Sequence, residues 1–211
     1  MKPITKELID EIHLALDKGL TKGLGVPVEG QMCVEALICF KLGLPHSDQP
    51  SCVHKEVIQA KIALNDCLWS SNKTRAEGMR KLAIAQLGSS HFENGLFYNT
   101  LKLNSTKRIL PYLIGKHFEK TKDQQLLVFK EKFEKLSVLD DDLWKKFYNY
   151  YTNYHTNYHY YSYNYYNYYN YNYNTNYYYY YYCFGDEFLL LIADTVLQTL
   201  IELKSEGCKW L

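Results

Sequence analysis

The chain has 211 residues, a formal net charge of +1 and 22% charged residues, with both signs mixed along its length. This balance excludes the basic surface by which a domain binds nucleic acid or an anionic membrane, so we expect neither partner. No run of 18 apolar residues is present, and the amphipathic N-terminus lacks the apolar segment and cleavage site of a secretory signal. We therefore expect a cytoplasmic protein with one sizeable domain.

Six cysteines are spread along the chain, and none of them forms a CxxC pair. A zinc ribbon or a thioredoxin-type redox centre normally needs such paired spacing, so neither is indicated. Because no export signal is found, we expect reduced thiols rather than disulfides. We expect no cofactor.

Apolar spacing predicts helices through the first half of the chain. The first spans Thr5 to Asp17, and a loop with four glycines follows over residues 19–31. The second helix, 32–42, is apolar nearly all round and should be buried, with Gly43 at its end. A turn containing two prolines then leads to a third helix that ends near Asn65. A fourth, capped at residues 70–72, runs to about Leu87.

The second half is less regular. Residues 91–104 are ambiguous, and Ser105 is predicted to cap a fifth helix that Pro111 kinks or begins. A charged helix is expected from Lys122 to Leu136, another from Ser137 with three aspartates near its start, and a last one from Gly185 or Asp186 to about 204–207. No stretch outside the Tyr/Asn tract alternates as a strand does. The predicted fold class is all-α, an irregular multi-helix bundle.

These elements suggest three parts. A helical domain covers 1–147, with its core at 32–90; a low-complexity tract of mostly Tyr and Asn covers 148–182; and a C-terminal helix within 183–211 packs back on the helical domain. The codons of Tyr, Asn and His differ only at the first base, which favours an expanded DNA repeat as the origin of the tract. Its tyrosines also suggest self-association, because Tyr buries a large area at low entropic cost.

The candidate nucleophile is Cys33, at the start of the second helix, where the helix dipole is expected to lower the pKa of a thiol. Catalysis would need His46 or His54 beside it, with Glu35 as a nearby acid. The run MCVEALICFKLGLPH resembles the nucleophile helix of NlpC/P60-type cysteine peptidases, but these place their histidine on a sheet, and no sheet is expected here. The alternative role of Cys33 is that of a small buried apolar side chain.

For two other groups of residues, a possible metal-ligand set and the acid Glu35, the sequence favours a structural role. Cys52 and His54, with His46 and Asp48, have the ligand types of a metal site, but their spacing is wider than usual, so we expect a capped turn and no metal. Glu35, in an apolar helix, needs a partner if it is buried, and Lys61, Arg75 or Arg80 would supply one. Trp69 is expected to anchor the turn between the third and fourth helices.

Four segments, MCVEALICFKLGLPH, KIALNDCLWSSN, RAEGMRKLAIAQLGSS and LIELKSEGC, resemble a family of uncharacterised helical proteins of bacterial and phage genomes. The resemblance implies that the Tyr/Asn tract occupies the place of a variable, Ala/Asp/Tyr-type repeat before the C-terminal helix. It implies no activity, ligand or catalytic residue.

The sequence as a whole favours a non-catalytic interaction or accessory protein that binds an unknown protein partner or itself. The alternative is a cysteine-dependent hydrolase or transferase that uses Cys33 with His46 or His54.

Overall fold

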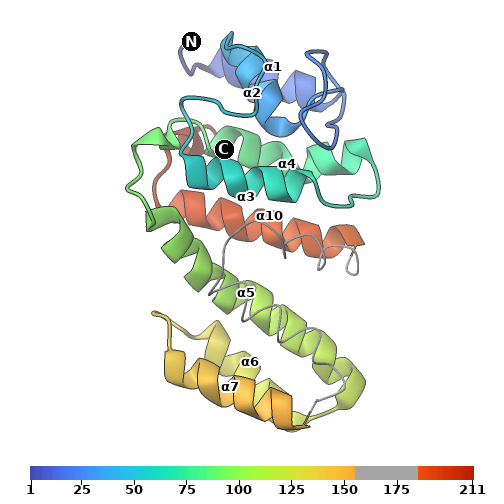
Figure 1. The fold of residues 1–211 in the computed structure, drawn as a ribbon, viewed down its shortest axis with the longest axis vertical. Coiled ribbons are helices and arrows are strands. Elements are labelled where there is room, and N and C mark those ends of the chain that lie inside the picture. The colour runs from blue at the N-terminus through green and yellow to red at the C-terminus, as the bar shows by residue number, and fades with distance from the viewer. Residues whose placement is uncertain (155–184) are drawn as a thin grey trace. The chain divides into compact units, whose positions relative to one another are not determined.

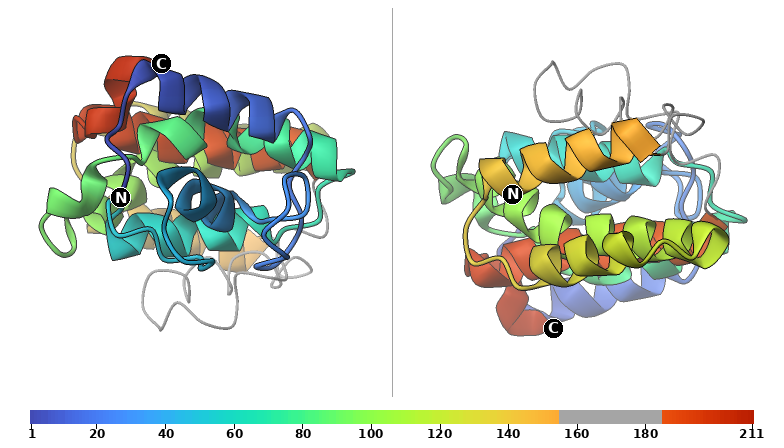
Figure 2. Two further views of the ribbon diagram at one scale, coloured as in Figure 1. Left: turned by 90° about the horizontal axis from the view of Figure 1, so that it is seen from above. Right: turned by 90° about the horizontal axis from the view of Figure 1, so that it is seen from below.

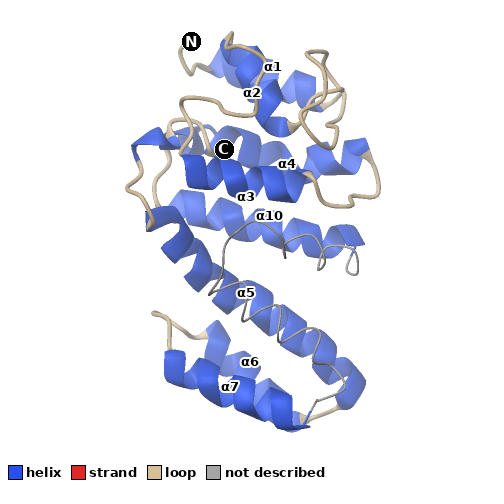
Figure 3. Ribbon diagram, viewed as in Figure 1, coloured by secondary structure: helices blue, strands red, loops and turns tan. Residues whose placement is uncertain are grey.

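A computed structural model describes residues 1–154 and 185–211. Within these residues the chain forms eight α-helices, two 3-10 helices and no strand, which confirms the all-α prediction (Figure 3). An isolated antiparallel bridge joins Gly25 to Met32. None of the described helices is long and apolar enough to cross a membrane. Predictions about Cys183 and about the tract beyond residue 154 lie outside the described residues.

The chain divides into two compact units. Among the described residues, unit 1 comprises 1–104 and 185–211, and unit 2 comprises 105–154. The helices wholly within unit 1 are α1 (Lys6–Leu16), α2 (Val34–Leu42), α3 (Lys55–Asn65), α4 (Asn72–Ala85) and α10 (Gly185–Glu202), with 3-10 helices at Ser89–His91 and Glu206–Trp210. Helix α5 (Leu96–Thr121) begins in unit 1 and ends in unit 2.

Unit 1 has α3 and α4 as its middle layer, with α1 and α2 on one side and α10 on the other (Figure 1). Helix α10 contacts α4 and α3, and the C-terminal 3-10 turn lies beside α4 (Figure 2). The turn docks closely because Gly207 N–H donates to the Leu87 carbonyl at 2.7 Å and a Cβ at Gly207 would collide with Ile84 backbone. The C-terminal turn therefore supplies a hydrogen-bond donor for a carbonyl group just beyond the C-terminal end of α4, where the helix itself offers none.

Local capping explains most helix ends in unit 1. Ser71 accepts from Thr74 N–H at 3.0 Å at the start of α4, and Thr5 caps α1 in the same way. Gly43 follows α2 in the left-handed conformation, φ 70°, which glycine adopts without steric cost. These ends lie within a residue or two of the predicted ones.

The prediction that Ser105 caps a fifth helix is wrong. Ser105 is buried inside α5, which is a single helix of 26 residues with Pro111 in its interior. Proline removes one backbone hydrogen bond there, yet α5 continues. Its first turns are held by tertiary contacts: Phe97 and Leu101 are buried, and Asn104 donates to Thr199 Oγ1 at 3.1 Å. Packing in unit 1 thus overrides the weak local helix propensity of residues 96–104.

Unit 2 contains the rest of α5 with α6 (Gln124–Glu134) and α7 (Asp141–Tyr154). Its core is rich in aromatic rings: Phe133 meets Phe147 edge-on at 5.4 Å between ring centroids and Trp144 at 5.8 Å. Edge-to-face contacts of this kind add to the stabilisation from buried area. The buried residues of this core are Leu110, Ile114, Leu126, Phe129, Phe133, Leu143, Phe147 and Tyr151.

Candidate functional site

Cys33 is the N-cap of α2 and is buried, with 4% of its surface exposed. Its sulfur accepts a hydrogen bond from Ala36 N–H at 3.4 Å. The expectation that the helix N-terminus lowers the pKa of this thiol is wrong, because burial outweighs that hydrogen bond and raises the pKa to about 11. A thiol with that pKa is protonated at neutral pH and is a weak nucleophile.

The two candidate histidines make their hydrogen bonds to backbone groups. His46 is exposed, and its Nε2 donates to the Gly25 carbonyl at 3.1 Å. His54 is buried and caps α3, where its Nδ1 accepts from Glu56 N–H at 3.3 Å. Each imidazole thus forms a hydrogen bond with a backbone group. Neither of these bonds involves the Cys33 thiol, which a catalytic Cys–His pair would require.

The metal alternative also lacks a site within the part of the chain that the structure describes, where no group of three His, Cys, Asp or Glu side chains is arranged to hold a metal ion. His54 caps its helix, as expected for this turn. The five described cysteines (Cys33, Cys39, Cys52, Cys67 and Cys208) are free thiols. Burial raises the pKa of Cys39 to about 12, so this thiol is inert too.

Glu35 of α2 is fully buried, and of its three predicted partners Lys61 is the one that meets it. Lys61 Nζ of α3 lies 3.1 Å from Glu35 Oε1, and neither side chain is exposed. Burial raises the pKa of Glu35 and lowers that of Lys61, while their mutual attraction opposes both shifts. Each charge therefore depends on the other to remain in the core. Removing one partner of such a pair typically costs about 3–5 kcal/mol.

Gln86, the C-cap of α4, completes this buried polar cluster, which we call the polar core (Glu35, Lys61 and Gln86). Its amide stabilises the Glu35 carboxylate and so opposes the rise in that group's pKa. Gln86 could not be predicted as a member of this cluster, because nothing in its local sequence distinguishes a buried amide from an exposed one. The polar core connects α2, α3 and α4, and it is closed to solvent.

A second feature of unit 1 is the glycine-rich segment of residues 19–31, which we call the N-loop. Gly25 and Gly30 have positive φ, 71° and 84°, and a Cβ at either would collide with backbone of Gln31 or Lys18. Only glycine fits these two positions without strain. The N-loop is therefore a tightly folded segment rather than a slack linker.

Side chains from α3 and α4 anchor the N-loop by hydrogen bonds to its backbone. Asn65, buried at the end of α3, donates to the Thr21 carbonyl at 2.9 Å and accepts from Val34 N–H at 3.2 Å. Arg75 of α4 donates to the carbonyls of Asn65 at 2.7 Å and Leu20 at 3.0 Å. The sequence indicated only that the third helix ends near Asn65. Its contacts with two distant segments were not predictable, because they depend on tertiary structure.

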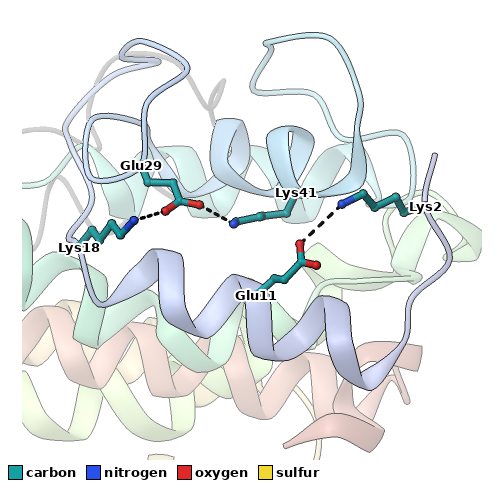
Figure 4. Close-up of polar contacts among 5 residues, drawn as sticks. All are labelled: Lys2, Glu11, Lys18, Glu29 and Lys41. Atoms are coloured by element: carbon teal, nitrogen blue, oxygen red, sulfur yellow. Dashed lines mark hydrogen bonds and ion pairs between the residues drawn. The ribbon is translucent and has the colours of Figure 1, made fainter.

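Charged side chains fix the outer side of the N-loop. Glu29 lies 2.5 Å from both Lys18, at the end of α1, and Lys41 of α2, and Lys2 pairs with Glu11 at 3.6 Å nearby (Figure 4). The two lysines lower the pKa of Glu29. Exposed pairs contribute little, but Lys41 is only 13% exposed, so the Glu29 bridge restricts the N-loop more than a fully solvated pair would.

The tip of the N-loop is apolar and faces solvent. All five residues of 24–28, Leu-Gly-Val-Pro-Val, are exposed, with Leu24 at 41%, Val26 at 48% and Val28 at 50%. Isolated exposed apolar residues are common, but a consecutive run of them is unusual unless it has a function. Such a run on an anchored loop is the kind of surface that partners contact.

Comparison with protein-family models, curated proteins and solved structures finds no match to this chain. The resemblance to a bacterial and phage family therefore stays a prediction.

Proposed function

We propose that this protein is a non-catalytic interaction protein, and that the tip of its N-loop, residues 24–28, inserts into an apolar surface of a protein partner. The observation that carries this proposal is the run of exposed apolar residues on a loop held in one conformation. A preformed loop loses little conformational entropy on binding, so more of the contact energy contributes to affinity. The buried, protonated thiol of Cys33 supports the absence of cysteine catalysis.

We further propose that the protein acts in the cytoplasm of a bacterium, or of a phage-infected cell. The free thiols of the five described cysteines support a reducing compartment. The bacterial or phage origin is supported only by the family resemblance of the four sequence segments.

Site-specific photo-crosslinking of the full-length protein in its own cells tests the proposed surface. A photoreactive residue replaces Val26 or, as a matched control, Val138, which is 69% exposed and lies in unit 2. We expect a discrete crosslinked species from position 26 that is absent from position 138. Adding Val28→Asp should abolish it without changing the thermal unfolding midpoint, because an exposed substitution leaves the fold intact.

Mass spectrometry of the species then identifies the partner. A different protein supports the proposal in its stated form, whereas a second copy of this chain replaces it by self-association through the same loop. Equal crosslinking from both positions, or none from position 26, contradicts it.

A further inference from the structure

The polar core contains more hydrogen-bonding capacity than its own members use. Lys61 has three N–H donors, the Glu35 carboxylate accepts through two oxygens, and Gln86 both donates and accepts. The side chains of all three are fully buried. Nevertheless Glu35 Oε1 and Oε2, Lys61 Nζ, and both polar atoms of the Gln86 amide lack a hydrogen bond of acceptable geometry.

The distances and orientations of the three side chains explain why these hydrogen bonds are missing. Lys61 Nζ and Glu35 Oε1 are 3.1 Å apart, which gives electrostatic attraction, but the approach lacks the angles of a hydrogen bond. The Gln86 amide likewise stabilises the carboxylate without satisfying either of its own atoms. The groups come from α2, α3 and the end of α4, so the backbone limits how far each can turn toward the others.

The surroundings offer no better partners. The buried thiols of Cys33 and Cys52 are near enough to interact electrostatically with Lys61, but a thiol is a weak donor and a weak acceptor. Buried groups of this kind are normally satisfied, and each one left without a partner destabilises the fold.

We infer that the polar core is a binding site for ordered internal water, which bridges Glu35, Lys61 and Gln86. Water is the ligand that fits the charge balance, because one carboxylate, one ammonium and one neutral amide leave no net charge for an ion to neutralise. A water molecule donates and accepts at once, so it can supply the hydrogen bonds that the ammonium, the carboxylate and the amide do not make with one another. This site is distinct from the N-loop, and neither proposal depends on the other.

A crystal structure of the wild-type protein, at a resolution that shows ordered solvent, tests the inference without any substitution. We expect density for water within hydrogen-bonding distance of at least two of the three side chains. Direct hydrogen bonds that close the triad with no water between its members would overturn it.

Magnetic relaxation dispersion of water oxygen, which counts long-lived internal water in solution, gives an independent test. The variant combines Glu35→Met, Lys61→Met and Gln86→Leu, and the control is Gln124→Leu at an exposed glutamine. We expect the triple variant to contain at least one long-lived water fewer than the wild type, and the control to contain the same number. Equal numbers in all three proteins would refute the site. If the triple variant does not fold, the wild-type crystal structure decides.

Discussion

Replacing Lys61 by methionine gives the sharpest test of the buried ion pair. The substitution keeps most of the apolar stem and removes only the charge that lies 3.1 Å from Glu35. The Glu35 carboxyl group then stays in a fully buried position without a counter-charge, where it can keep its charge only at a high cost. The expected loss in the free energy of unfolding at neutral pH is about 3–5 kcal/mol, the usual cost of breaking such a pair.

The pH dependence of this loss follows from the carboxyl group. Burial already raises the pKa of Glu35 above its ordinary value of 4.5, and the loss of Lys61 raises it further. Above pH 4.5 the unfolded chain releases the proton that the folded variant retains, so the stability of the variant falls as the pH rises. The slope is about 1.4 kcal/mol per pH unit, until the pH passes the folded-state pKa. The variant is therefore closest to wild type near pH 5 and furthest from it near pH 8.

Urea unfolding followed by circular dichroism at pH 5 and pH 8 measures both effects. Lys73→Met, at an exposed lysine of α4, is the control and should change stability by less than about 0.5 kcal/mol. The double variant Glu35→Met with Lys61→Met should regain most of the loss, because it removes the orphaned charge. The reasoning fails if Lys61→Met costs no more than Lys73→Met, or if its cost does not depend on pH.

Two further predictions concern the packing of unit 1. The pKa of His13 is lowered mainly by burial and by Arg80, whose Nη1 lies 3.3 Å from His13 Nδ1. Neutral His13 therefore stabilises the fold above pH 6.5, and this stabilisation is lost as the pH falls through the folded-state pKa of His13. The unfolding midpoint of wild type should fall more between pH 7.5 and pH 5.5 than that of His13→Gln, and equal falls would contradict this. Gly78→Ala should lower the free energy of unfolding by about 1–3 kcal/mol, because the new Cβ collides with the Trp69 ring. Calorimetry measures the change, and an unchanged or raised midpoint would show that the collision costs no more than the roughly 1 kcal/mol that alanine gains in helix propensity.

Features that depend on local chemistry were predictable from the sequence. The glycine after α2 and the serine before α4 act within one turn of their own helix, so the spacing of Gly43 and Ser71 was sufficient. The apolar periodicity of α10 similarly placed its start within a residue, whereas its end, Glu202, lies before the predicted 204–207. Trp69 is buried and donates to the Leu64 carbonyl at 2.9 Å, as expected for an anchor.

Features that depend on contacts with distant residues were not predictable from the sequence. The sequence offered three basic residues as possible partners of Glu35. Lys61 is the partner because α2 packs on α3, a contact that the sequence does not reveal. The start of α5 was missed because its polar residue Asn104 finds partners in α10, 95 positions away at Thr199. The raised pKa of Cys33 was missed as well. Burial of the second helix was predicted, but whether burial outweighs the helix dipole at Cys33 depends on the tertiary packing around the thiol.

The rate at which iodoacetamide modifies Cys33 tests the non-catalytic account most directly. A pKa raised from 9.0 to about 11 leaves about 100-fold less thiolate at a given pH. Peptide mass spectrometry after reaction at pH 6 should show modification of Cys33 at least about 100-fold slower in the folded protein than in urea, since burial adds to the pKa effect. Fast, selective modification of Cys33 in the folded protein would contradict the account and favour a cysteine-dependent enzyme.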